Sequence, residues 1–299
     1  MSKLSYNLEF WLRFLSRSFD RSIPSCSESD IEDNNVHYYC QISKPFSLAN
    51  VQTVSQINLL KHSSYSYDLY TILFPFRKNL RFRFIPGDVT FVPEEPTFVK
   101  SRPINNSNHN SILLPLDSYR HFKFVNDLIP FREKNDSIVW RGAAYQKHRI
   151  DFLRKCSRFP FADLGNTAVG QGLEIGFVKP WLSIFEQLRS KFIVSIEGND
   201  VATNLKWIMS SNSVCMMPEP KFETWYKEGS LRAGYHYIKI ASDYSDFEEQ
   251  YRKYLANPDE CERIIQNANE YANSFRSAHK RLVDARKVVS KYQNLYSVK

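Results

Sequence analysis

The sequence predicts an α/β protein built of two domains, and three observations lead to this prediction. The chain has 299 residues, more than a single compact core usually holds. Its second half alternates between strand-like and helix-like stretches, which is typical of a parallel sheet covered by helices. Its first half contains short apolar and aromatic runs separated by prolines, a pattern of strands and tight turns. Two domains imply a cleft between them.

The first domain is expected to span residues 1–125. Within residues 4–19 the apolar side chains follow helical spacing with basic residues between them, so an amphipathic helix is predicted. Such a helix ordinarily packs on its own domain, and peripheral contact with a membrane surface is the alternative. Residues 22–35 predict a polar loop, and the apolar runs within residues 72–99 predict strands.

The second domain is expected to span residues 126–275, because a polar stretch at 126–136 precedes its first strand. The sequence predicts strands at 137–140, 192–196 and 213–217, and helices at 148–157, 181–190 and 202–210. Ligands of a parallel sheet of this kind bind beyond the carboxyl ends of its strands.

Two long helical patterns, 258–275 and 279–296, close the chain, and residues 276–299 are assigned to a separate C-terminal helix. Asn257 and Pro258 make a good helix start, with asparagine at the N-cap and proline at the first helical position.

Composition narrows the class of protein. No run approaches the roughly 20 apolar residues of a membrane-spanning helix, and the N-terminus lacks the apolar centre of a secretory signal. Five dispersed cysteines without a CxxC pair fit reduced thiols, so we expect a cytoplasmic protein without a zinc site. The net charge of +8 favours acidic partners: nucleic acid, an anionic membrane surface or a phosphorylated small molecule.

The first candidate for phosphate binding follows the strand at 137–140. Arg141 and Gly142 come directly after Trp140, and Arg149 lies in the helical stretch that follows. A guanidinium group can bind two phosphate oxygens at once, and glycine lets backbone amides approach a ligand. The arrangement predicts a diphosphate cradle, although an arginine after a strand more often forms an ordinary surface or interdomain pair.

The second candidate repeats this order of strand, turn and helix. The strand at 192–196 leads into the turn Glu197-Gly198-Asn199-Asp200, and the predicted helix that follows contains Lys206. Amides at a helix N-terminus favour phosphate, and an acidic side chain can accept hydrogen bonds from sugar hydroxyls. The alternative is that Asp200 only caps the helix and Gly198 only turns the chain. We expect the two turns to converge on one pyrophosphate.

Asp88 is the candidate for a general base. It lies at a Pro-Gly turn of the first domain, where a carboxylate facing the cleft can take a proton, although aspartate after Pro-Gly is usually a turn residue. Four further residues are assigned to the acceptor side or the cleft: Lys100, Arg102, Trp140 and His236. For His236 the alternative is a packed histidine, which is commoner than a catalytic one.

These motifs occur in an order that resembles glycosyltransferase family 90, which includes protein O-glucosyltransferases, fungal capsule-associated transferases and bacterial lipopolysaccharide-modifying enzymes. The resemblance runs from residue 84 to residue 275, is bacterial in type, and is poor before residue 84. It is strongest in five pieces: Lys100-Ser101-Arg102-Pro103; Trp140-Arg141-Gly142 with Arg149; Ala162-Asp163; Glu197-Gly198-Asn199-Asp200 through Lys206 to Ser211-Asn212-Ser213; and His236-Tyr237 followed by Asp243 and Ser245-Asp246.

The resemblance implies a GT-B-like architecture, in which two Rossmann-like domains face a central cleft and the final helix crosses back to the first domain. It also implies inverting transfer from a UDP-sugar, with no metal and no other cofactor. The family's general base matches Asp88, and Arg141 and Arg149 match the arginines that hold the donor diphosphate. The remaining donor-side positions are assigned to Gly142, Asp163, Glu197, Gly198, Asn199, Asp200, Asn204 and Lys206.

One part of the chain departs from the family pattern. Many relatives carry an arginine two residues before the lysine that matches Lys206, and a serine two residues before that arginine. This chain has Asn204 and Ala202 in those places. The donor pocket therefore has one cation fewer, and Lys206 is expected to compensate.

The sequence thus predicts a UDP-sugar-dependent hexosyl- or pentosyltransferase that acts on a glycan or lipid-linked glycan of lipopolysaccharide or capsule type. The expected location is the cytoplasm, extending to the inner face of the membrane. Two alternatives stay open: a glycan-binding protein without catalysis, suggested by Asn204 and Ala202, and a basic nucleic-acid-binding protein. The chain shows no recognised nucleic-acid-binding motif, so no nucleic-acid partner is predicted.

Overall fold

The computed structural model describes residues 34–61, 63–105, 107–168 and 175–297. The amphipathic helix expected within residues 4–19 lies outside these ranges. The α-helices are α3 (Asn34–Tyr39), α4 (Ser63–Leu73), α5 (Ser118–His121), α6 (Lys147–Cys156), α7 (Ile184–Gln187), α8 (Leu205–Met209), α9 (Phe247–Leu255), α10 (Pro258–Asn273) and α11 (Ala278–Leu295). The strands are β1 (Thr97–Val99), β2 (Ser101–Pro103), β3 (Ser111–Leu113), β4 (Asn135–Gly142), β5 (Ala162–Asn166), β6 (Ser190–Val194), β7 (Val214–Met217), β8 (Phe222–Thr224) and β9 (Ile238–Lys239).

The second half of the chain forms a five-stranded parallel sheet in the order β5-β4-β6-β7-β9. From β4 the chain moves outward to β5 on one side, and β6, β7 and β9 extend the sheet on the other. The neighbouring strands β4 and β6 therefore mark the topological switch point, where ligands of open parallel sheets bind. This sheet confirms the predicted α/β class.

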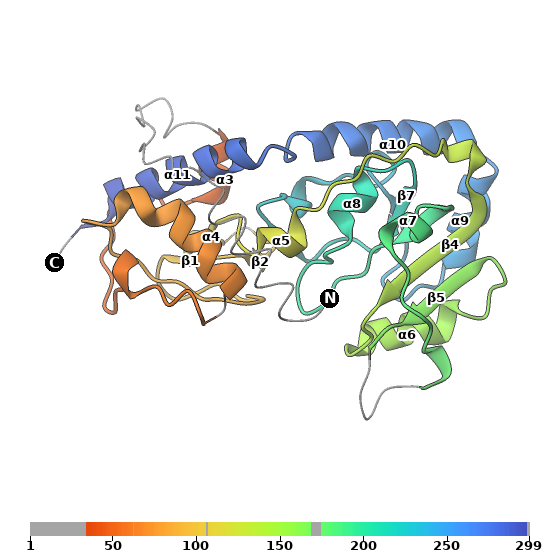
Figure 1. The fold of residues 1–299 in the computed structure, drawn as a ribbon, viewed down its shortest axis with the longest axis horizontal. Helices are drawn as coiled ribbons and strands as arrows, with labels where there is room; N and C mark the ends of the chain where they lie inside the picture. The colour runs from red at the N-terminus through yellow and green to blue at the C-terminus, as the bar shows by residue number, and fades with distance from the viewer. Residues whose placement is uncertain (1–33, 62, 106, 169–174, 298–299) are drawn as a thin grey trace.

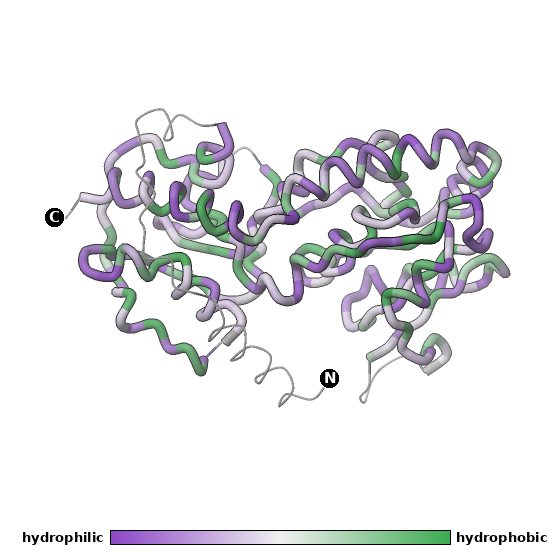
Figure 2. The backbone as a smooth tube through the Cα atoms, turned by 45° about the horizontal axis from the view of Figure 1, so that its top comes forward, coloured by the Kyte–Doolittle hydropathy of each residue, from purple (hydrophilic) through white to green (hydrophobic). Residues whose placement is uncertain are grey.

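The central strands are buried because their side chains are apolar on both faces. Phe192, Ile193 and Val194 of β6 are fully buried, and every residue of β7 is buried as well. A strand of this kind needs helices on both sides. Figure 2 shows hydrophobic backbone in the interior strands and hydrophilic stretches along the long C-terminal helices.

The helices of the second half were only partly predictable. The patterns at 148–157, 258–275 and 279–296 correspond closely to α6, α10 and α11. The pattern at 181–190 contains only the short helix α7, and Asn257 does not cap α10 with its side chain. Its amide group instead donates to the carbonyl of Lys253.

The first half contains fewer strands than its pattern predicts. The apolar run at 72–76 ends helix α4 and forms the 3-10 turn Phe74–Phe76, so the predicted strand at this point is wrong. Buried side chains of this stretch repeat at helical spacing, at Leu69, Ile72, Leu73 and Phe76. A short apolar run alone does not distinguish a strand from the end of a buried helix.

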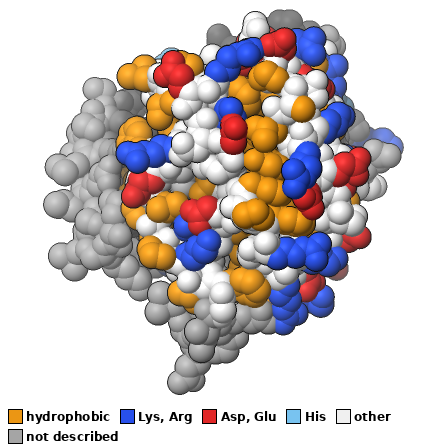
Figure 3. Space-filling view, turned by 90° about the vertical axis from the view of Figure 1, so that its right-hand side faces the viewer, with side chains coloured by type: hydrophobic (Ala, Val, Ile, Leu, Met, Phe, Trp, Pro, Cys, Tyr) orange, Lys and Arg blue, Asp and Glu red, His pale blue; other side chains and the backbone are white. Residues whose placement is uncertain are grey.

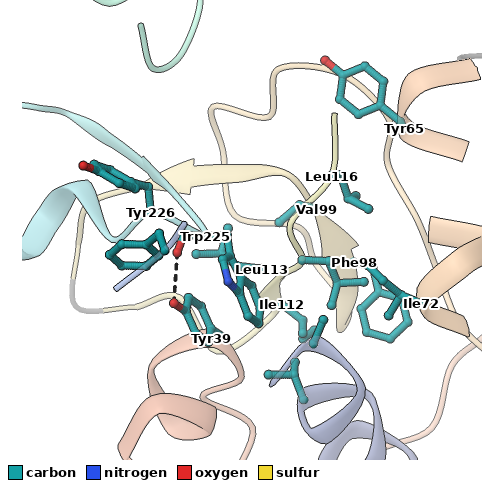
Figure 4. Close-up of a cluster of buried hydrophobic side chains, with 14 of the residues drawn as sticks. Tyr39, Tyr65, Ile72, Phe98, Val99, Ile112, Leu113, Leu116, Trp225 and Tyr226 are labelled. Carbon is teal, nitrogen blue, oxygen red and sulfur yellow. Dashed lines mark hydrogen bonds between the residues drawn. The ribbon is translucent and has the colours of Figure 1, made fainter. Parts of the chain in front are cut away.

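A hydrophobic core connects the two halves. Strands β1 and β3 form a parallel pair, and their buried residues pack with Tyr39, Ile72 and Trp225 (Figure 4). The hydroxyl of Tyr39 donates to the carbonyl of Trp225 at 2.9 Å. Because this core contains side chains from both sides of residue 125, the predicted domain boundary does not divide it.

Two further elements join the halves. Helix α11 packs against α3 and α4, so the end of the chain returns to the first half (Figure 1). Strand β2 pairs antiparallel with β8, and in this pair Nε of Arg102 lies 2.7 Å from Oε1 of Glu223. Arg102 is 1% exposed and also donates to two backbone carbonyls. The structure therefore places Arg102 in a buried structural pair rather than in the cleft.

In the part of the chain that the structure describes, no helix combines the length and the apolar character needed to cross a bilayer.

Candidate active site

A pocket of about 300 Å³ lies at the carboxyl ends of β4 and β6, between the two halves of the chain. Asp88 and Lys100 line it from the first half, and the second half contributes both predicted turns. Its predicted lining residues are Asp88, Lys100, Trp140, Arg141, Gly142, Arg149, Gly198, Asn199, Asp200 and Asn204. The two turns, distant in sequence, therefore share one pocket at the switch point of the sheet.

Arg149 is a partly buried cation that contacts backbone carbonyls, and no carboxylate, within the described residues. Its guanidinium donates to the carbonyls of Ala143 at 2.9 Å, Ile196 at 2.7 Å and Glu197 at 2.8 Å, so it ties the two turns together. Among the described residues, no carboxylate forms an ion pair with it, and burial lowers its pKa to about 10. A buried charge of this kind is costly unless it is paired, and an anionic ligand in the pocket can supply that pair.

Arg141 is in a different position, although it lines the same pocket. Its Nη2 lies 2.8 Å from Oδ2 of Asp163, and its Nε donates to the carbonyl of Pro180 at 3.0 Å. Lys179 contacts the same carboxylate at 2.8 Å. Arg141 is thus already paired in this structure with a carboxylate that it shares with Lys179, and Asp163 supports Arg141 from the neighbouring strand.

The turn after β6 does not lead directly into a helix. Helix α8 begins only at Leu205, so the helix N-terminus expected at residues 198–200 is absent there. The amide of Gly198 donates to the carbonyl of Asp200, and the side chain of Asp200 reaches Lys100 rather than capping α8. Phosphate binding by this turn therefore has to rely on its loop amides and on Arg149.

Asp88 faces the pocket from the first half. Lys100 Nζ lies 2.6 Å from its Oδ1, and the Asn199 amide donates to its Oδ2 at 3.2 Å. Burial alone would raise the pKa of Asp88, but Lys100 and the hydrogen bond from Asn199 outweigh this effect and lower it. The carboxylate is therefore ionised at neutral pH and able to accept a proton.

Glu197 faces a second pocket of about 300 Å³, which shares the loop from Ile196 to Val201 with the first. Its Oε1 accepts hydrogen bonds from the amides of Lys221 and Phe222 at 2.9 and 3.1 Å. Burial raises the pKa of Glu197 to about 7 despite these bonds. Near neutral pH this carboxyl can therefore donate or accept a hydrogen bond.

Three other predicted residues have mainly structural contacts. Lys206 is fully buried in α8 and its Nζ lies 2.6 Å from Oε1 of Glu228, so it does not reach the first pocket as a compensating cation. Asn204 lines that pocket and donates to the carbonyl of Val194 at 2.9 Å. His236 is packed in a turn, where its Nδ1 accepts from the amide of Arg232 at 3.0 Å, away from the first pocket.

Sequence reasoning missed four polar or charged residues of the pocket: Arg120, His121, Gln146 and Thr203. Arg120 donates to the Tyr65 hydroxyl at 3.0 Å, and His121 is buried with neither ring nitrogen hydrogen-bonded within the described residues. Burial and nearby cations hold the pKa of His121 well below its usual value, so its ring stays neutral. No local motif marks these four residues. Arg120 and His121 lie on the short helix α5, which only the fold brings to Asp88.

Replacing Gly142 by alanine is expected to destabilise the protein by about 1–3 kcal/mol. A Cβ there would lie 2.6 Å from Cζ2 of Trp140, which is on the same face of β4 two residues earlier and is nearly fully buried. Denaturant unfolding measures the change. Gly176→Ala is the matched control, because a Cβ at Gly176 meets nothing within 4 Å. Equal stability of the two variants would show that the Trp140 ring moves aside at little cost.

Comparisons with known proteins agree with the motifs. Residues 117–299 match the model of glycosyl transferase family 90. The chain is also 45% identical over 264 residues to O-glucosyltransferase LpsA of Dichelobacter nodosus, an alignment that covers 88% of this chain and 83% of that relative. The resemblance seen in the motifs is thereby confirmed, and the chain belongs to glycosyltransferase family 90.

Proposed function

We propose that this glycosyltransferase moves a sugar from a UDP-sugar to a hydroxyl of a glycan with inversion at the anomeric carbon. One observation carries the proposal: Asp88, a candidate base, and Arg149, a cation that has no acidic partner in the part of the chain that the structure describes, line one pocket from opposite halves of the chain. The donor sugar is glucose, because the similar protein is named an O-glucosyltransferase. The two halves correspond to the facing domains of a GT-B architecture.

In the proposed reaction, Asp88 takes the proton of the acceptor hydroxyl while the oxygen of that hydroxyl bonds to the anomeric carbon from the face opposite UDP. The bond from that carbon to the phosphate oxygen breaks, and its electron pair leaves with UDP. Arg149, Arg141 and the loop amides around Gly198 stabilise the charge that grows on the diphosphate, where preorganised donors contribute most. No metal is needed if these groups supply the positive charge.

The acceptor is proposed to be a glycan of lipopolysaccharide or capsule type, reached in the cytoplasm at the inner face of the membrane. This part of the proposal extends the family resemblance. Asn204, which departs from the family pattern, lines the pocket, so the proposed donor site has a neutral amide where many relatives have a cation.

The nucleic-acid alternative requires a continuous basic surface. On the face shown in Figure 3, the described Lys and Arg side chains are interspersed with Asp and Glu and with hydrophobic groups. Such a mixed surface fits a net charge of +8 spread over a globular protein and does not favour phosphate-backbone binding on that face.

Titration calorimetry with UDP tests the proposal first. We expect one site per chain with a dissociation constant between about 1 µM and 1 mM, the usual range for enzyme substrates. Release of UDP from UDP-glucose in the presence of a glycan acceptor then tests catalysis. UDP binding without turnover of any UDP-sugar would favour the non-catalytic glycan-binding protein. No UDP binding, together with strongly salt-dependent binding to arbitrary DNA, would favour the nucleic-acid alternative.

A further inference from the structure

A buried lysine links the candidate base to the turn after β6. Lys100 is 2% exposed, and its Nζ lies 2.6 Å from Oδ1 of Asp88 and 2.7 Å from Oδ2 of Asp200. The side chain of Asp88 is 29% exposed, whereas that of Asp200 is 4% exposed. One cation therefore holds two carboxylates that line the pocket, of which that of Asp88 is partly exposed and that of Asp200 is buried.

The positions of these groups are fixed from several sides. The hydroxyl of Ser101 bonds both the amide and the carbonyl of Val89 at 3.0 Å, which anchors the turn that carries Asp88. Asn199, next to Asp200, donates to Asp88 and accepts from Gln146 at 2.9 Å. The base and the loop proposed to hold the diphosphate thus form one connected network.

The proposed reaction changes the charge of this network. When Asp88 takes the acceptor proton it becomes neutral. If Asp88 were the only partner of Lys100, proton uptake would leave a buried ammonium without an anion, which is strongly unfavourable. Because Asp200 contacts the same ammonium, Lys100 remains paired both before and after the proton moves.

We propose that Asp200 is a positioning residue that acts through Lys100: it keeps this cation paired when Asp88 is protonated and so makes Asp88 a stronger base. The inference rests on the proposed function, because it needs Asp88 to be the base. Neither Asp200 nor Lys100 takes a proton from the acceptor in this scheme.

The expected pH effects follow from the charges around Asp88. It faces Lys100 from the β1–β2 connection, the Tyr65 hydroxyl of α4 at 3.4 Å, Arg120 of α5, and the Asn199–Asp200 turn. Removing the cation Lys100 raises the pKa of Asp88. Removing the anion Asp200 leaves the whole charge of Lys100 to Asp88 and lowers that pKa.

Three variants test the inference: Asp200→Asn, Lys100→Met and the double variant. We expect Asp200→Asn to lower kcat about tenfold or more, since it weakens but does not remove the general base, with UDP affinity near the wild-type value. In Lys100→Met the acid limb of the kcat/KM profile should rise by about one pH unit or more. In the double variant the acid limb should lie at a lower pH than in Lys100→Met, because Asp88 is then left without the neighbouring anion Asp200.

If Asp200 has a purely structural role, the losses of kcat in the two single variants add in the double variant. The acid limb of the double variant then stays where it is in Lys100→Met. Wild-type kcat in Asp200→Asn, or equal acid limbs in Lys100→Met and the double variant, overturns the inference. If Lys100→Met does not fold, Asp200→Glu decides, because it keeps the anion and should retain more turnover than Asp200→Asn. Wild-type turnover in Asp88→Asn would instead overturn the assignment of Asp88 as the base. Loss of turnover in Asp88→Asn supports that assignment, and the variants above then test the role of Asp200 alone.

Discussion

Replacing Asp88 by asparagine is expected to lower turnover about 10²–10⁴-fold, the usual contribution of a general base, while UDP binds nearly as well as to the wild type. Asparagine has almost the same shape as aspartate but cannot take the acceptor proton. The variant should also fold, because Lys100 keeps Asp200 as a partner and no buried cation is left unpaired. Release of UDP from UDP-glucose measures turnover, and calorimetry with UDP measures affinity.

Asp136→Asn is the matched control for this experiment. Asp136 is the second residue of β4, its side chain is 60% exposed, and it pairs with Lys191 away from the pocket. We expect wild-type turnover and UDP affinity from it. If Asp88→Asn loses UDP binding as well as turnover, the substitution disrupts the pocket and says little about the base. Wild-type turnover of Asp88→Asn would show that another group accepts the proton.

The second half of the fold was predictable because its signals are local. The last three residues of β6 and all of β7 are continuous apolar runs, and α10 and α11 have long helical repeats. The first half was not predictable in the same way. Its short apolar run at 72–76 fits a strand as well as a helix end, and only packing in the core shared with the second half decides between them.

The location of the site could be predicted, but not what each side chain does there. Loops after neighbouring parallel strands meet at one edge of a sheet, which is why the turns after β4 and β6 share a pocket. Arg141 and Arg149 look equivalent in the sequence. They differ in the structure because Asp163, on the adjacent strand β5, forms an ion pair with Arg141 and not with Arg149. Contacts of this kind depend on strand order and leave no local pattern.

The same reason explains the residues that were assigned to the site and lie elsewhere. Lys206 and Arg102 belong to motifs shared with the family, yet both form fully buried ion pairs with glutamates. A residue belongs to a motif for a structural reason, such as a buried ion pair in the core, as well as for a role in ligand binding. Arg120 and His121 show the converse, since they line the pocket without any motif to mark them.

Replacing Arg149 by methionine is expected to lower kcat/KM about 10²–10³-fold and to weaken UDP binding about ten- to hundredfold. The guanidinium is the charged group of the pocket for which the described residues provide no acidic partner, so the diphosphate is proposed to provide one. Methionine keeps an unbranched stem beside the Trp140 ring, above which the guanidinium carbon of Arg149 now lies at 5.8 Å. Calorimetry with UDP and steady-state turnover of UDP-glucose measure the two effects.

The melting temperature separates a ligand-binding role of Arg149 from a structural one. Saturating UDP stabilises a protein that binds it, so UDP should raise the melting temperature of the wild type much more than that of Arg149→Met. Arg154→Met is the matched control, since Arg154 lies on the same helix with its side chain 56% exposed, and it should respond to UDP like the wild type. Arg149→Lys should recover only part of the affinity, because lysine keeps the charge but not the planar fork that bonds both turns. An unchanged UDP affinity in Arg149→Met would show that the three carbonyl contacts, and not the diphosphate, are the reason for an arginine at this position.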